Sequence, residues 1–151
     1  MENKHIKIMQ KIIIVSGYFN PIHPGHINLF KVAKRLGDKL IIILNNDYQV
    51  KIKNSVLFMN QSERKKVVES IKYVDCVVIS IDKDMTVCKT LQSLYNRFSK
   101  SRRNSLTFAN GGDRRKGTIP EDKICKKLNI KMVYNIGGGK SQSSSWLIGL
   151  V

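Results

Sequence analysis

Long apolar runs are absent from this sequence, and so is any leader pattern at its start. No stretch approaches the roughly 20 apolar residues that a membrane-spanning helix needs. Residues 1–11 are polar and lack the apolar centre of a secretory signal peptide. We therefore expect a cytoplasmic protein without a membrane partner.

Cysteine is scarce and widely spaced. The chain has only Cys76, Cys88 and Cys125, with no CxxC pair. This spacing predicts neither a disulfide framework nor a structural zinc site, and we expect no metal-ligating residues. Cys76 lies in an apolar run, so it is interpreted as a small core residue.

Acidic residues are also few, at 11 against 27 lysines and arginines, which leaves a net charge of +16. Such a charge attracts phosphate-bearing molecules. A basic nucleic-acid-binding module is one reading, supported by clusters such as Arg102–Arg103. The chain shows no helix-turn-helix, zinc-finger or RNA-binding signature, and its aromatics are not interleaved with the basic runs. Nucleic acid is therefore the less favoured partner.

The apolar residues, 42% of the chain, are distributed as short buried runs that alternate with amphipathic stretches. The pattern predicts strands over 12–15, 40–44, 76–79, 106–109 and 131–134, and helices over 26–36, 60–70, 86–98 and 120–128. Residues 45–59 are expected to form a polar loop. This order predicts an α/β fold, a Rossmann-like open parallel sheet of about five strands with helices on both faces. Residues 1–151 fit one domain, with 1–10 as a polar N-terminal extension.

The turn after the first strand carries the most distinctive residues. In open parallel sheets, ligands bind beyond the carboxyl ends of the strands. His23 and His26 fall there, at the start of a helix whose free N–H groups attract anions, and Gly17 is expected to let backbone approach a ligand. No third metal ligand lies nearby in sequence, so the pair predicts a phosphate site.

Three other segments fall where this rule places ligands. Lys51 and Lys53 follow the second strand, and at alternate positions of an extended segment they would point the same way. Gly111 and Asp113 follow the fourth strand and should face the histidines if the strand order reverses between the first and fourth strands. A Gly/Ser-rich stretch over 137–145 offers hydroxyls and amides to phosphates.

Together these segments resemble the HxGH nucleotidyltransferase superfamily, and its cytidylyltransferase-like branch in particular, with His23 and His26 as the two histidines. The resemblance implies transfer of CMP from CTP to a phosphorylated small alcohol or sugar, with release of pyrophosphate. Adenylyl transfer from ATP to a sugar phosphate or a cofactor precursor stays open, because the base pocket of such folds is largely backbone.

The resemblance also assigns residues. The catalytic residues it implies are His23, His26 and Lys53. The nucleotide-binding residues it implies are Gly17, Tyr18, Phe19, Asn20, Gly25, Gly111, Asp113, Lys140, Ser143, Ser144 and Ser145. The substrate-binding residues it implies are Lys51, Asp47 and Arg64.

The chain departs from the family pattern at the head of the Ser-rich segment, where glycine stands in place of the usual arginine. Lys140 is expected to substitute as a point charge. Mg²⁺ is the expected cofactor, held on the phosphates with few protein ligands. A homodimer is also expected, because only a short tail follows Trp146 and a partner subunit could complete that edge.

Overall fold

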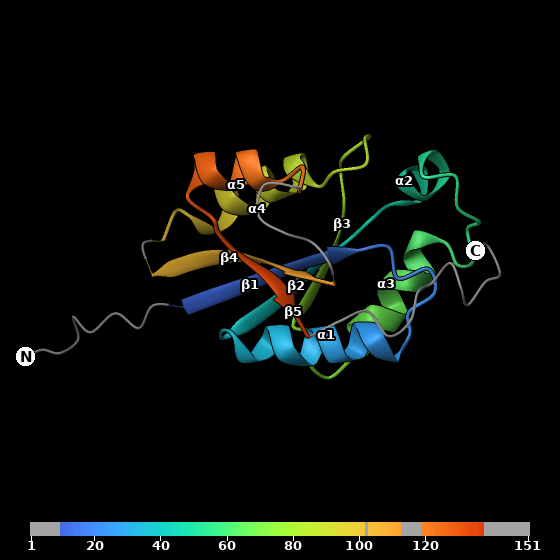
Figure 1. The fold of residues 1–151 in the computed structure, drawn as a ribbon, viewed down its shortest axis with the longest axis horizontal. Coiled ribbons are helices and arrows are strands. Elements are labelled where there is room, and N and C mark those ends of the chain that lie inside the picture. Colours follow the sequence, from blue (N-terminus) through green and yellow to red (C-terminus); the bar gives the residue numbers. More distant parts are fainter. Residues whose placement is uncertain (1–9, 102, 113–118, 138–151) are drawn as a thin grey trace, which may run out of the picture.

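The computed structural model describes residues 10–101, 103–112 and 119–137. Within them, strands and helices alternate along the chain, except that two helices lie between the second and third strands (Figure 1). The strands are β1 (Gln10–Gly17), β2 (Lys39–Leu44), β3 (Cys76–Ile79), β4 (Asn104–Gly111) and β5 (Lys131–Ile136). The helices are α1 (Pro24–Arg35), α2 (Asp47–Ile52), α3 (Gln61–Glu69), α4 (Cys88–Phe98) and α5 (Asp122–Leu128).

The strands form one sheet in the order β3-β2-β1-β4-β5, and every neighbouring pair is parallel. The chain runs outward from β1 to β3, then returns to the other side of β1 for β4 and β5. The strand order therefore reverses between β1 and β4, which is the condition under which Gly111 and Asp113 were expected to face the histidines. The predicted α/β class and the five-stranded parallel sheet are both confirmed.

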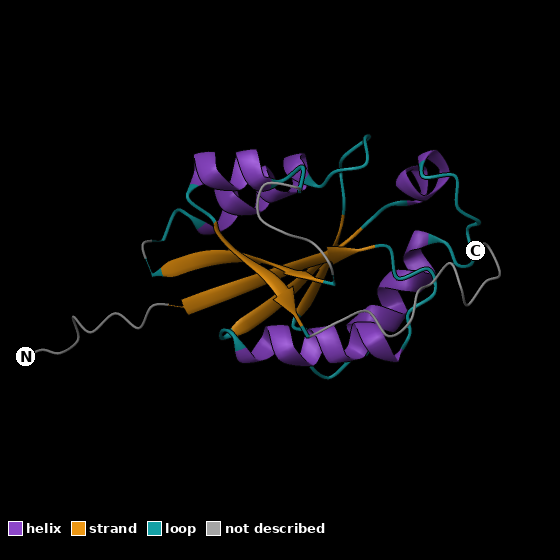
Figure 2. Ribbon diagram, viewed as in Figure 1, coloured by secondary structure: helices purple, strands orange, loops and turns teal. Residues whose placement is uncertain are grey.

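Two apolar layers flank the sheet, because successive side chains of a strand point to opposite faces. Phe30 of α1 and Val68 of α3 pack on one face, together with Ile13 and Val15 of β1. Leu91 of α4 packs on the other face, with the alternate residues of the strands. Figure 2 shows the resulting three layers, with helices on both sides of the sheet.

Three local expectations were wrong. The expected loop over 45–59 contains α2, which begins after an Asn46 side chain that accepts from Gln49 N. Pro120 lies before α5 rather than in its first turn, because the helix starts at Asp122. Cys76, the first residue of the edge strand β3, is exposed and is not a core residue.

The helix predicted over 60–70 is present as α3, and it begins with a reciprocal cap. Asn60 accepts a hydrogen bond from Glu63 N at 2.9 Å, and Glu63 accepts one from Asn60 N at 3.1 Å. This reciprocal pair is the capping box that the sequence spacing indicates.

None of the helices in the described part of the chain is both long and apolar enough to cross a membrane.

Candidate active site

The turn that follows β1 is shaped by an aromatic ring. Phe19 is buried and has a positive φ of 50°, a backbone region that non-glycine residues seldom occupy. Its ring lies 4.9 Å from that of His26 and 5.2 Å from that of Phe30, both edge to face. A Cβ added to Gly17 would lie 2.6 Å from the Phe19 ring. The space that a side chain at Gly17 would need is thus filled by the Phe19 ring. The approach of a ligand to this backbone stays a prediction.

The side chains of His23 and His26 cap the start of α1 by accepting hydrogen bonds from backbone N–H groups. Nδ1 of His23 accepts from Gly25 N at 3.1 Å, and Nδ1 of His26 accepts from His23 N at 3.1 Å. The two rings are stacked, with centroids 3.7 Å apart and planes at 23°. The predicted proximity of the two imidazoles is therefore confirmed.

This capping fixes the tautomers. An imidazole nitrogen that accepts from a backbone N–H cannot carry a proton, so each neutral ring holds its proton on Nε2. Each ring thereby carries an N–H donor beside the helix N-terminus, whose partial positive charge favours anions. Such an arrangement can bind phosphate oxygens and stabilise charge that develops on them.

Asn20 connects this turn to a distant segment. Its side-chain amide donates to the carbonyl of Val56 at 2.6 Å and accepts from Phe58 N at 2.8 Å and Met59 N at 3.2 Å. The Asn20 side chain is thus committed to backbone groups and holds the 56–59 segment beside the histidine turn.

The two lysines after β2 do not lie as predicted. Lys51 belongs to α2 and Lys53 is its C-cap residue, and residues two apart on a helix do not share a face. Lys53 Nζ lies 4.1 Å from the centroid of the Tyr18 ring, which places it beside the β1 turn. Lys51 instead lines a pocket. The prediction of an extended segment with both lysines on one side was wrong, because Asp47–Ile52 forms a helix.

Arg64 is fully buried, although an arginine beside Glu63 on a helix would ordinarily form a surface ion pair and the family resemblance assigns it to the substrate. Its guanidinium donates to the carbonyls of Met59 at 3.0 Å, Tyr18 at 2.8 Å and Asn45 at 2.8 Å, and to Asp47 at 2.7 Å. The surface reading is wrong. Arg64 joins the ends of β1 and β2 to α2 and α3, and it neutralises Asp47.

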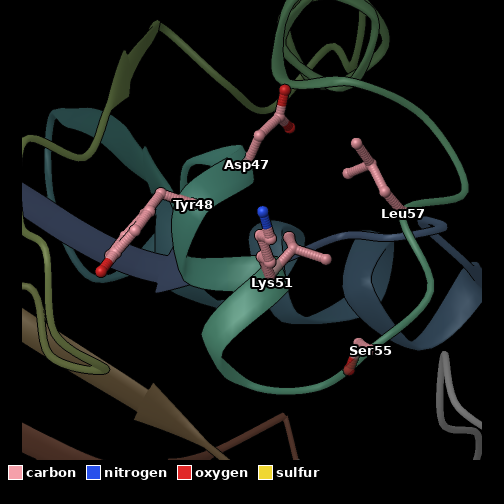
Figure 3. A pocket seen from close by; sticks show the side chains of 6 residues that line it. Asp47, Tyr48, Lys51, Ser55 and Leu57 are labelled. Atoms are coloured by element: carbon pink, nitrogen blue, oxygen red, sulfur yellow. The ribbon is translucent and has the colours of Figure 1, made fainter.

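A pocket of about 310 Å³ lies between α2 and the segment that follows it. Its lining residues are Asp47, Tyr48, Val50, Lys51, Ser55 and Leu57. Figure 3 shows that Asp47 and Lys51 come from α2, while Ser55 and Leu57 come from the following segment. Two of the three predicted substrate-binding residues therefore meet in one pocket, and Arg64 lies beneath it through its bond to Asp47.

The end of β4 lies against α1. A Cβ added to Gly111 would lie 2.8 Å from the Leu29 side chain. The end of β4 therefore packs closely on α1, one turn beyond the histidines. Gly112 has a positive φ of 64°. The remaining residues of the predicted nucleotide site, Asp113, Lys140, Ser143, Ser144 and Ser145, lie outside the described residues.

The comparison with protein families decides the family. A model described as cytidylyltransferase-like matches residues 14–139, most of the chain. This chain belongs to the cytidylyltransferase-like family. The matched range contains the β1 turn, α2 and the pocket.

Relatives of this cytidylyltransferase-like chain include proteins with two different names. FAD synthase from Archaeoglobus fulgidus is 40% identical over 48% of this chain and 52% of its own. Glycerol-3-phosphate cytidylyltransferase from Staphylococcus aureus is 38% identical over 45% of this chain and 52% of its own. The chain spans about half the length of the curated relatives it matches.

A solved structure shows the same fold. The lipopolysaccharide core biosynthesis protein from Thermoplasma volcanium superposes with a TM-score of 0.66 at 21% identity, covering 83% of this chain and 96% of that one.

The sequence did not predict α2, nor that Leu57 of the following segment lines a pocket with it. α2 could have been found from the spacing of Asn46 and Gln49, which forms a capping box like that of α3. No sequence signal indicates that Leu57 lines a pocket, because this depends on the bonds from Asn20 to a segment more than 30 residues away.

Proposed function

We propose that this cytidylyltransferase-like protein is a nucleotidyltransferase that joins a nucleoside monophosphate to a phosphorylated small molecule. The observation that carries the proposal is the stacked pair His23 and His26, whose Nε2 donors lie at the N-terminus of α1 and at the reversal point of the sheet. This is where open parallel sheets bind ligands.

The proposed reaction is a displacement at the α-phosphorus. A phosphate oxygen of the acceptor forms the new P–O bond while the bond to the pyrophosphate oxygen breaks, and pyrophosphate leaves with the electron pair. His23 and His26 donate to the α-phosphate and to the oxygen of the leaving group. Catalysis then comes from positioning and from stabilisation of negative charge.

The lysines are assigned to the attacking side. Lys53, beside the β1 turn, balances charge near the α-phosphate, and Lys51 holds the acceptor phosphate in its pocket. Gly111 and Asp113 are assigned to the nucleoside, and Lys140 with Ser143, Ser144 and Ser145 to the β- and γ-phosphates.

CMP from CTP remains the first proposal for the transferred group. AMP from ATP is supported comparably, because the relatives include both FAD synthases and a glycerol-3-phosphate cytidylyltransferase. Pyrophosphate release measured with each nucleotide, in the presence of a panel of phosphate esters, distinguishes the two.

Mg²⁺ is proposed to enter with the nucleotide. In the described residues no group of three or more His, Cys, Asp or Glu side chains is placed to hold a metal, and both histidines already use Nδ1 as an acceptor. The phosphate oxygens therefore suit the ion better than this donor set does, and there it would neutralise charge on the pyrophosphate.

The histidine variants test the proposal. His23 is the N-cap residue of α1, and asparagine is a favourable N-cap residue. His23→Asn therefore keeps a side-chain acceptor for the cap but removes the Nε2 donor. We expect His23→Asn and His26→Ala each to lower kcat about 10²-fold or more while the protein stays folded by circular dichroism. Ile27→Ala, an exposed residue of the same helix turn, serves as the matched control. Normal pyrophosphate release from both histidine variants would contradict the mechanism.

A further inference from the structure

Three consecutive apolar residues are exposed beside the Lys51 pocket. The exposed fractions are 55% for Val56, 44% for Leu57 and 57% for Phe58. Single exposed apolar side chains are ordinary, whereas grouped ones mark a surface that contacts another molecule. This run, here called the apolar wall, therefore needs a functional explanation.

The apolar wall is fixed in place by buried polar side chains. Asn20 bonds to the backbone of Val56, Phe58 and Met59, and the Arg64 guanidinium bonds to the carbonyl of Met59 at 3.0 Å. Asn20 is 4% exposed and Arg64 is 0% exposed. The backbone is thus held with its apolar side chains outward, and a preorganised surface loses little entropy when a ligand binds.

The pocket beside the wall carries a cation. Asp47 is neutralised by its ion pair with Arg64 at 2.7 Å, whereas Lys51 is exposed and makes no ion pair within the described part of the chain. A ligand of this pocket should therefore combine a negative group for Lys51 with a surface that suits Leu57.

Hydroxyl groups have few partners here. Apart from Asp47 and Lys51, the lining side chains with polar atoms are Ser55 and Tyr48, and Figure 3 shows the Tyr48 ring directed to the far side of α2 from Leu57. Among the lining side chains, a polyol beside Leu57 would find the Ser55 hydroxyl as its nearby partner, and each further hydroxyl that loses water without a partner costs free energy. An apolar group would instead remove Leu57 and its neighbours from water.

We infer that the acceptor is a phosphate monoester whose organic part is apolar, with the phosphate at Lys51 and the apolar part against the wall of Val56, Leu57 and Phe58. This inference rests on the proposed function, and it separates such esters from small polyol phosphates.

A ligand series tests it on the full chain. We would measure the binding of glycerol 3-phosphate, phenyl phosphate and 1-naphthyl phosphate by calorimetry, with a non-hydrolysable nucleotide present. We expect affinity to rise along the series, with 1-naphthyl phosphate at least about tenfold tighter than glycerol 3-phosphate. Leu57→Asn should weaken the naphthyl ester about tenfold and leave glycerol 3-phosphate unchanged. Lys51→Met should weaken both.

Leu36→Asn is the matched control, because Leu36 is a leucine of similar exposure, 39%, at the far end of α1. Equal loss of naphthyl binding in Leu36→Asn and Leu57→Asn would mean unspecific adsorption and would overturn the inference. Tighter binding of glycerol 3-phosphate would overturn it as well. In either case, pyrophosphate release with glycerol 3-phosphate would leave the proposed function intact, whereas no release with any ester would remove both.

Discussion

Arg64 shows why a single residue can be misread in sequence. It follows Glu63 in a helix that is rich in charge, so a solvated ion pair is the ordinary expectation. In the fold, its guanidinium lies beneath the pocket and satisfies three backbone carbonyls and one carboxylate. The sequence around Arg64 does not reveal this, because three of the four acceptors lie in two distant segments, at Tyr18 and at Asn45 and Asp47.

Replacing Arg64 should destabilise the protein. Arg64→Met would leave three backbone carbonyls without this donor and Asp47 without its cation. A buried polar group left without its partner costs about 1–3 kcal/mol. We expect the urea midpoint to fall accordingly, with little change from Lys66→Ala, an exposed residue of the same helix. A small shift for Arg64→Met, equal to that of the control, would contradict the buried network.

The cysteines should differ in reactivity. Burial raises the pKa of Cys125 to about 12, so at pH 8 only about one molecule in ten thousand carries the reactive thiolate. Burial also raises the pKa of Cys88, whereas Cys76 is exposed.

Iodoacetamide at pH 8, followed by mass spectrometry, should label Cys76 first and Cys125 only after unfolding in urea. Labelling of Cys125 at the rate of Cys76 in the native protein would show that α5 does not pack as described.

At the scale of elements, the strands were the most predictable parts. Runs such as 40–44 are continuous and β-branched, which suits a strand buried on both faces of a parallel sheet. The histidine turn was also predictable, because its position follows from the strand before it. α2 was not predicted, since it has only six residues and its amphipathic pattern is too short to separate from a loop. The pocket, which depends on α2, was therefore missed with it.

Asn20 should control acceptor binding through the 56–59 segment. Asn20→Ala removes the donor to Val56 and the acceptor for Phe58 and Met59, so the apolar wall loses its anchor. We expect KM for the acceptor to rise about tenfold or more, while KM for the nucleotide changes less; each loss of a buried hydrogen bond costs about 1–3 kcal/mol.

Steady-state pyrophosphate release with each substrate varied in turn measures this split. Asn96→Ala, an exposed asparagine on α4, is the control. Equal increases in both KM values would indicate a general loss of structure and not positioning of the wall.

At the scale of the whole molecule, the net charge of +16 should appear in the salt dependence of nucleotide binding. Exposed charges are screened over a Debye length of about 10 Å at 0.1 M salt. We expect KM for the nucleotide to rise several-fold between about 50 and 300 mM NaCl, with kcat nearly constant. Steep salt-dependent binding of duplex DNA without any nucleotide turnover would instead support the nucleic-acid-binding alternative.

The close packing of α1 on the sheet has a mechanical consequence. The helix begins at the stacked imidazoles, and its next turn contacts two other strand ends: Leu29 lies against Gly111, and Asn28 donates to the carbonyl of Gly137 at 3.3 Å. A rigid-body shift of α1 would therefore also displace Gly111, at the end of β4, and Gly137, directly after β5. A displacement of the first turn of α1 should therefore change the positions of both strand ends together.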